Sequence, residues 1–312
     1  MVVLPKIRAW YPCCQRTAQA ELARWRPVWS REQKAFAGAA SSVALSFLAA
    51  QTWNWSLCDT HQAPKDTRLS EADEALLLCA LDTALENFRQ WTQAPASWWD
   101  ECRNVRMPGF GDARHCKKKL DGFPLRLMMV SALWENVSLD ELIMVTEMTD
   151  DCVKLKFVPL MESVQTRFSF PGGRILRTTV KPLLLGLVSS REVESVMKEP
   201  ETMPDGSVVS VGVGLQSPLL LEKIQQSDVL KALASEPPSK GKVRSVDHTS
   251  GYSFEPLEDK EPFQKGKWRV HIVILSEDTG GLPAWALEMG IFYGTIDWFA
   301  AADKYLKRLS NT

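Results

Sequence analysis

The sequence carries none of the signatures of common catalytic sites. It has no G-x-S-x-G nucleophile motif, no phosphate-binding loop of the G-x-x-x-x-G-K-[ST] type, no H-E-x-x-H zinc motif and no dinucleotide fingerprint. The four histidines, His61, His115, His248 and His271, are scattered, and nothing at metal-ligand spacing accompanies His115 and its neighbour Cys116. We therefore expect a protein that is not an enzyme, with no metal site and no cofactor, and with His271 solvated on the polar face of a strand.

An excess of charge of either sign is also missing. The 312 residues include 37 Lys and Arg against 38 Asp and Glu, so no overall field draws the protein to nucleic acid, and we expect no nucleic-acid partner. The seven cysteines are odd in number and irregular in spacing, which argues against a disulfide framework and fits a reducing compartment. The length suits one large domain with an extension, or two domains.

The first 55 residues differ from the rest of the chain. They are basic and poor in acids, hold five of the 12 tryptophans, and contain an uncharged stretch over residues 35–53 that is rich in Ala, Ser and Gly. Three interpretations stay open: a targeting segment, a membrane anchor or interfacial helix, and an extra helix packed on the domain. We assign residues 1–69 to an N-terminal extension with a linker, and 70–312 to the folded domain.

Within 70–312 the patterns predict strands between two helices. Ser70 is expected to cap a helix, and Asp121 and Gly122 to form the turn of a hairpin. A further helix is expected over 217–235, starting at Pro218. Short strands are expected near 153–158, 162–170, 174–181, 191–199, 207–215 and 242–248.

The C-terminal sixty residues are the most informative part of the chain. Residues 268–275 alternate as a strand, and the last thirty residues have the 3.6-residue period of one long amphipathic helix. A helix laid across a curved sheet encloses a hollow. The apolar loop 181–190, KPLLLGLVSS, lies between two predicted strands and is either tucked into the core or presented to something apolar.

Four motifs, in order, resemble those of the StAR-related lipid-transfer (START) family. KKKLDGFPLRLMMVSALWENVSLDELI is similar to its opening hairpin and first helix, and KPLLLGLVSSREVESVMKE with PDGSVVSVGVGL to its hydrophobic loop and Arg-containing strand. KGKVRSVDHTSGYSFEPLE resembles its K-G-x-V-R strand and the partner strand, and SEDTGGLPAWALEMG its entry to the last helix.

The resemblance implies an α+β helix-grip fold, in which a curved antiparallel sheet wraps around the long C-terminal helix and an internal apolar tunnel. It implies that one lipid is bound and carried between membranes, with the loop 181–190 and the last helix as the gate. The expected lipid-binding residues come from three strands, the loop and the last helix: Thr178, Val180, Leu184, Leu187, Arg191, Val193, Ser195, Met197, Val211, Trp285, Met289, Phe292 and Ile296.

Three departures from the family pattern bear on the ligand. Residues 217–235 are an insertion, the family's Trp-Asp is missing near residues 150–152, and Met197 and Thr178 stand where sterol-carrying members have an ion pair. A phospholipid-like ligand is therefore favoured over a sterol. Arg191 is left as the cation of the tunnel wall, where it contacts a phosphate or pairs with Glu192 or Glu194.

The expected partners are a lipid and a membrane surface, with the protein a cytoplasmic monomer that associates peripherally with membranes and is directed to an organelle if residues 1–55 are a targeting segment. The alternatives are a membrane-tethered lipid sensor and a protein-interaction scaffold that docks through residues 217–235. An enzyme of the wider helix-grip class would need an acid or base facing the cavity, and the sequence offers no strong candidate for one.

The gate assignment gives a first prediction. Replacing Leu184 and Leu187 by Asp should abolish lipid transfer between liposomes while the circular dichroism spectrum stays unchanged, because a charged loop loses its affinity for the bilayer interior. Transfer at the wild-type rate would contradict the gating role of this loop.

Overall fold

A computed structural model describes residues 68–107, 110–148, 152–158, 161–182, 189–258, 261, 263–278 and 283–310. All of them belong to one compact unit, which spans 61–183 and 189–312. The predictions for residues 1–55 lie outside the described residues. None of the described helices is both long and apolar enough to cross a membrane.

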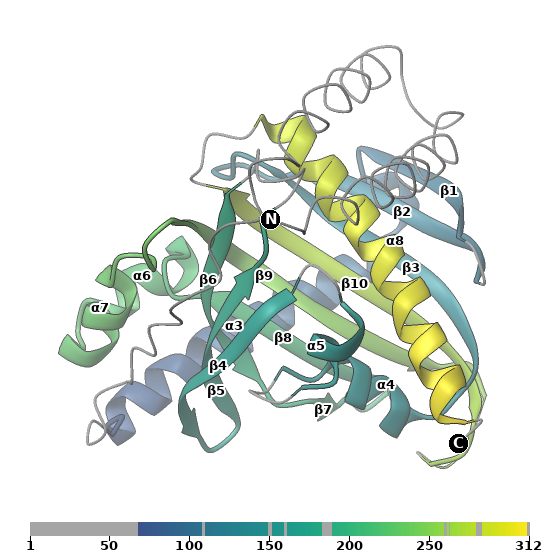
Figure 1. The fold of residues 1–312 in the computed structure, drawn as a ribbon, viewed down its shortest axis with the longest axis horizontal. Coiled ribbons are helices and arrows are strands. Elements are labelled where there is room, and N and C mark those ends of the chain that lie inside the picture. Colours follow the sequence, from purple (N-terminus) through teal and green to yellow (C-terminus); the bar gives the residue numbers. More distant parts are fainter. Residues whose placement is uncertain are drawn as a thin grey trace, which may run out of the picture. The chain divides into compact units, whose positions relative to one another are not determined.

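A ten-stranded sheet forms the body of the domain (Figure 1). Its order is β1-β2-β3-β10-β9-β8-β6-β5-β4, with β7 paired to β8, and all pairings are antiparallel except a short parallel one between β6 and β9. The strands are β1 (Glu101–Met107), β2 (Gly111–Lys119), β3 (Arg126–Val137), β4 (Met161–Phe170), β5 (Gly173–Val180), β6 (Ser190–Lys198), β7 (Glu201–Thr202), β8 (Val208–Gly214), β9 (Lys242–Pro256) and β10 (Gly266–Asp278).

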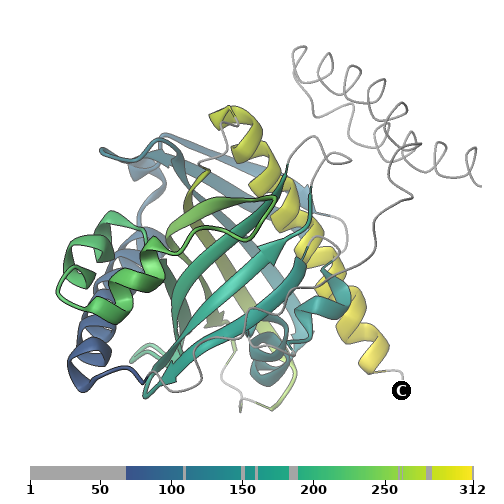
Figure 2. The ribbon, with the colours of Figure 1, turned by 60° about the vertical axis from the view of Figure 1, so that its left-hand side comes forward.

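Helix α3 (Glu71–Gln93) packs on one face of the sheet, which we call the outer face (Figure 2). It begins at Ser70, whose hydroxyl accepts from the backbone N–H of Asp73, while the Asp73 carboxylate accepts from the Ser70 N–H. The buried stripe of α3 meets Val211 on β8 and Val273 on β10. Gly251 on β9 leaves room for β8 and for α3, because a Cβ there would lie 2.4 Å from the Ser210 carbonyl oxygen and 3.1 Å from the Phe88 ring.

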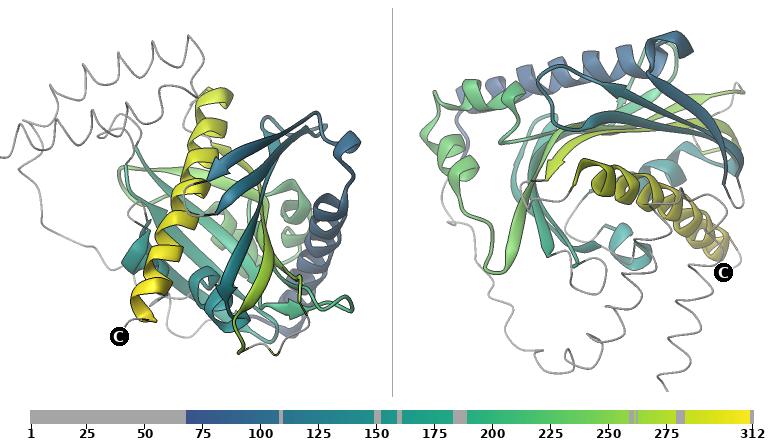
Figure 3. Two further views of the ribbon diagram at one scale, coloured as in Figure 1. Left: turned by 90° about the vertical axis from the view of Figure 1, so that its right-hand side faces the viewer. Right: turned by 90° about the horizontal axis from the view of Figure 1, so that it is seen from above.

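Helix α8 (Ala284–Leu309) crosses the opposite, inner face of the sheet, as the view from above in Figure 3 shows. Aromatic side chains fix it there. The Phe299 ring lies 5.7 Å from Trp134 on β3, and the Trp298 ring lies 5.5 Å from Tyr252 on β9. The curved antiparallel sheet and its C-terminal helix form the helix-grip fold that the sequence predicts.

The shorter helices are α4 (Leu139–Thr146), α5 (Lys154–Phe157), α6 (Pro218–Ile224) and α7 (Asp228–Ser235), with one 3-10 turn, η2 (Ala96–Trp98). The turn at Asp121 and Gly122 and the helix after Ser70 are confirmed. The strand expected near 153–158 is wrong: the segment contains α5, and Lys154, which a strand pattern places in solvent with Lys156, is buried. The helix expected over 217–235 is split, because Ser227 caps a second helix.

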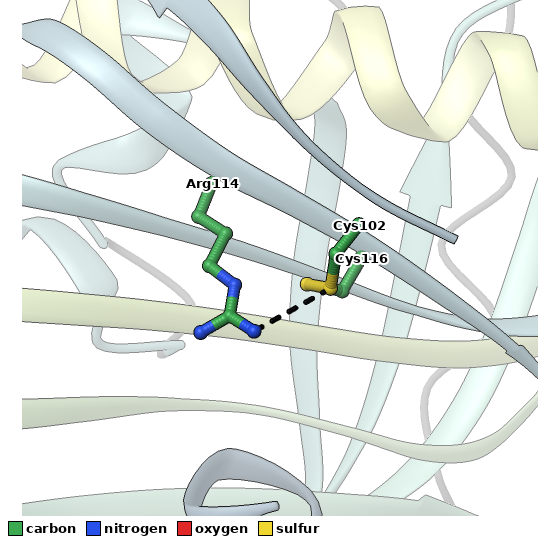
Figure 4. Close-up of a disulfide and its surroundings, with 3 residues drawn as sticks. All are labelled: Cys102, Arg114 and Cys116. Carbon is green, nitrogen blue, oxygen red and sulfur yellow. Dashed lines mark hydrogen bonds between the residues drawn. A yellow bond between two sulfur atoms is a disulfide. The ribbon is translucent and has the colours of Figure 1, made fainter. Parts of the chain in front are cut away.

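One disulfide corrects the expectation from the cysteine count. Cys102 on β1 and Cys116 on β2 are directly opposed in the register and are bonded, with 4.2 Å between their Cα atoms (Figure 4). The Arg114 guanidinium lies beside them, with Nη2 3.6 Å from Cys102 Sγ. The spacing of the cysteines along the chain does not predict this pairing, because the contact between Cys102 and Cys116 depends on the register of two strands. The bond ties the largely exposed edge strand β1 to the sheet.

Removing the disulfide should destabilise the domain measurably. The Cys102→Ser/Cys116→Ser variant should lose about 3 kcal/mol of unfolding free energy, the value for a loop of roughly 15 residues. Urea denaturation with and without dithiothreitol tests this. The reductant should lower the stability of the wild type to that of the variant and leave the variant unchanged; equal stability of the oxidised wild type and the variant would contradict the prediction.

Candidate functional site

The inner faces of β5 and β6 bring together most of the residues that the sequence assigns to the lipid. In the register, Thr178 lies opposite Val193, and Val180 opposite Arg191. Val196 packs in the α3 core on the outer face, so its odd-numbered neighbours on β6 point to the inner face. Met197 accordingly packs against Leu176 and Val164. The six predicted positions on these strands therefore share one face: Thr178, Val180, Arg191, Val193, Ser195 and Met197.

Helix α8 supplies the other wall. Phe292 is buried and stacks on the His115 ring of β2 at 4.2 Å, and Ile296 is buried one turn further along. Met289 is half-buried, and Trp285, in the first turn, remains 47% exposed. The exposed end of α8 thus carries Trp285, while the buried middle carries Phe292 and Ile296.

Three predicted residues do not join this group. Val211 lies in the core between β8 and α3, on the outer face, so the structure contradicts its assignment to the lipid-binding wall. Val209, Val211 and Val213 form the apolar face of β8, and the inner face carries Gly212 and Gly214, so the apolar pattern alone does not tell which helix covers Val211. Leu184 and Leu187 lie outside the described residues.

Arg191 lies on the inner face, as predicted, but the predicted ion pair with Glu192 or Glu194 does not form. Its Nη1 donates to the backbone carbonyl of Ser189 at 2.6 Å. Glu192 and Glu194 project from the opposite face of β6, where they contact Arg177 and Arg244. The alternation of the strand therefore excludes the structural ion pair between Arg191 and its neighbouring glutamates.

These glutamates belong to an outer ion cluster that the sequence analysis missed. Glu236, just after α7, accepts from Arg167 at 2.9 Å and contacts Arg177 at 2.8 Å, and Glu194 lies 3.3 Å from Arg177. Burial raises the pKa of Glu194, against the opposing effect of Arg177. The cluster, Arg167, Arg177, Glu192, Glu194, Glu236 and Arg244, attaches the segment that follows the inserted helices α6 and α7 to β4, β5, β6 and β9.

Three of the described histidines, His115, His248 and His271, are buried rather than solvated. His271, expected at the surface, is 9% exposed, and burial lowers its pKa to about 4. His115 is buried beneath α8, and the same cause lowers its pKa to about 3. Both imidazoles are therefore neutral at pH 7. No group of three His, Cys, Asp or Glu in the described part of the chain is arranged to hold a metal ion.

The sequence analysis also missed an acid on the inner face. Asp247 lies opposite Ser276 in the β9–β10 register, after an irregularity that shifts the alternation of β9 by one residue. It accepts a hydrogen bond from Ser250 Oγ at 3.3 Å, and burial raises its pKa to about 6. The register shift explains the omission, since strict alternation from Tyr252 and Ser250 places residue 247 on the outer face.

The raised pKa of Asp247 makes stability depend on pH. The unfolded chain releases this proton near the ordinary pKa of 3.8, whereas the native protein keeps it until about pH 6. Stability should therefore fall as pH rises through that interval, by about 3 kcal/mol in total. Asp247→Asn removes the effect, so the variant should match the wild type near about pH 3 and be more stable above about pH 7. A stability difference that does not change with pH would contradict this assignment.

Comparison with known proteins supports the architecture. The solved structure of human StAR-related lipid transfer protein 5 matches 76% of this chain and 99% of its own, with a TM-score of 0.60 at 16% identity. Human STARD10 matches 74% of this chain and 82% of its own, with a TM-score of 0.53 at 14% identity. No family model matches the sequence, and no curated protein matches it. The predicted fold is confirmed: this chain has the helix-grip fold of these solved structures.

Proposed function

We propose that this protein binds a single lipid between the inner face of its sheet and α8, and transfers that lipid between membranes. The observation that carries the proposal is the composition of this face. Val193 and Met197 on β6 and Phe292 on α8 supply apolar surface, interrupted by isolated polar groups such as Ser195 and Thr178. The solved structures with this fold include proteins named for lipid transfer.

The energetics of a lipid in water require such a lining. Each CH₂ group of a monomeric lipid costs about 0.8 kcal/mol in water, so a carrier must offer an apolar wall of comparable area. Methionine suits this wall because its flexible thioether adapts to chains of different shape.

We further propose a phospholipid-like ligand in preference to a sterol. Met197 lies opposite Arg174 in the register, and Thr178 opposite Val193, so neither position holds an ion pair with the other. A sterol presents one hydroxyl group, whereas the inner face carries charged side chains from two strands, Arg191 and Asp247. Charged groups that face a ligand favour a ligand that is itself charged.

The proposal includes peripheral association of a monomer with a membrane surface. The exposed indole of Trp285 suits the boundary between water and lipid, where an amphipathic ring is stabilised. A role of residues 1–55 in organelle targeting is part of the proposal. No catalytic turnover is required of this site.

Lipid extraction and transfer test the proposal together. The full chain, purified from a heterologous host and measured by native mass spectrometry, should carry one extractable lipid per protein. Val193→Trp should slow phospholipid transfer between liposomes by about tenfold or more, because overfilling the inner face costs ~1–3 kcal/mol. Leu221→Trp, at an exposed position of α6, is the matched control and should transfer at the wild-type rate.

A protein that is empty after purification and takes up no lipid from liposomes would overturn the carrier. A protein that binds lipid stoichiometrically but does not release it to acceptor liposomes would instead favour the alternative, a membrane-tethered lipid sensor or an interaction scaffold on the same fold.

A further inference from the structure

Lys154 is a buried cation without a carboxylate partner among the described residues. It is 2% exposed and is one of the largest fully buried side chains of the domain. Its ammonium donates to the Tyr252 hydroxyl at 3.2 Å and lies 4.6 Å from the centre of the Tyr252 ring. Both interactions involve a neutral group, so neither neutralises the charge.

The surroundings place this ammonium on the inner face. Helix α5 lies beside β4 and α8, and its Phe157 ring is 5.3 Å from Tyr305 of α8. Tyr252 is in the middle of the sheet, opposite Ile272 of β10 and Ser210 of β8, and its ring is 5.5 Å from Trp298. Lys154 therefore extends from α5 at one side of the inner face to the central strand β9.

Other buried cations of this domain are neutralised. On the same face, the half-buried Lys117 is 3.1 Å from the Glu288 carboxylate, which also binds Arg126. On the outer face, Arg177 contacts three glutamates. An isolated buried ammonium costs several kcal/mol unless an anion compensates it. At Lys154 the protein supplies a phenol and a ring face, which leaves the anion to be supplied by a ligand.

We infer that Lys154 and Tyr252 form the binding site for the phosphate group of a phospholipid held on the inner face. This inference rests on the proposed lipid-binding function. The Tyr252 oxygen accepts from Lys154, so its own proton is available to donate to a second phosphate oxygen, and the two residues present two donors from one side. Lys154 fits this role better than Arg191, which is half-buried and donates to the Ser189 carbonyl.

The chain contains a matched control two residues away. Lys156 lies on the same short helix and is exposed, so Lys156→Met changes the same charge without touching the inner face. In Lys154→Met the apolar side chain replaces the buried ammonium with similar volume. The ligand-free Lys154→Met variant should be at least as stable as the wild type, because removing an uncompensated buried charge favours folding.

The experiment uses the full chain and vesicles that contain phosphatidylcholine, oleate or cholesterol as separate probes. The wild type and Lys156→Met should take up phosphatidylcholine equally. Lys154→Met should lose about tenfold to hundredfold in phosphatidylcholine affinity, the range of a charge-assisted hydrogen bond, and Tyr252→Phe should lose less. Uptake of cholesterol should not depend on Lys154. If Lys154→Met fails to fold, Lys154→Gln and Tyr252→Phe decide the question.

The outcomes separate this inference from the carrier function. A wild type that loads only cholesterol or oleate, or a Lys154→Met variant that loads phosphatidylcholine as the wild type does, overturns the phosphate site and leaves the carrier function in place. A ligand-free Lys154→Met variant that is clearly less stable than the wild type assigns the pair to structure and also overturns the site. A wild type that loads no lipid overturns both proposals.

Discussion

Most strands of this sheet pack against different helices on their two faces. On the outer face they meet α3, and on the inner face they meet α8 and α5. Because successive side chains of a strand point to opposite faces, each strand divides its residues between these two environments. On β6, Val196 belongs to the α3 core and Met197 to the inner face. The assignment of every site residue depends on this alternation and on the places where it shifts.

The outer face neutralises its buried charges within the protein. The outer ion cluster matches three arginines with three glutamates, and Ser239 adds a hydrogen bond to Glu192. The cluster holds the segment after α7 against β4, β5 and β6, although Arg167 Nε, Arg177 Nε and Glu192 Oε1 are buried without a hydrogen-bond partner. The segment that follows α6 and α7 is thus part of the support of the strands that carry the candidate site.

The architecture could be predicted from the sequence because the strongest hydrophobic periodicities lie in the helices and strands that define it. The stripe of α8 and the capping box of α3 are local signals, and both elements form where they are expected. The same reasoning failed where the outcome depends on register between distant segments. Asp247 follows a shift in the β9–β10 pairing, the disulfide requires Cys102 to oppose Cys116, and Lys154 lies on a single helical turn whose alternating lysines imitate a strand.

Val211 shows a different limit of prediction from the sequence. Its strand has apolar residues on one face and glycines on the other, so the hydrophobic pattern indicates which face is buried but not which helix buries it. The structure gives the apolar face to α3 and leaves Gly212 and Gly214 facing inward, where a Cβ at Gly212 would collide with Met197 and one at Gly214 with the Asp247 backbone. The glycines therefore let neighbouring strands close tightly around the inner face.

Two charged side chains of the inner face, Lys154 and Asp247, are the features that folding alone does not explain. Lys154 on α5 has the phenol of Tyr252 as its partner, and Asp247 on β9 has the Ser250 hydroxyl, so neither of these hydrogen bonds supplies an opposite charge. Replacing buried charges of this kind with apolar residues is commonly neutral or stabilising, so their presence costs stability. The outer face shows that the domain can neutralise buried charges with protein groups alone. Polar groups left without such partners on the face that packs against α8 are therefore best understood as groups whose partners arrive with the ligand.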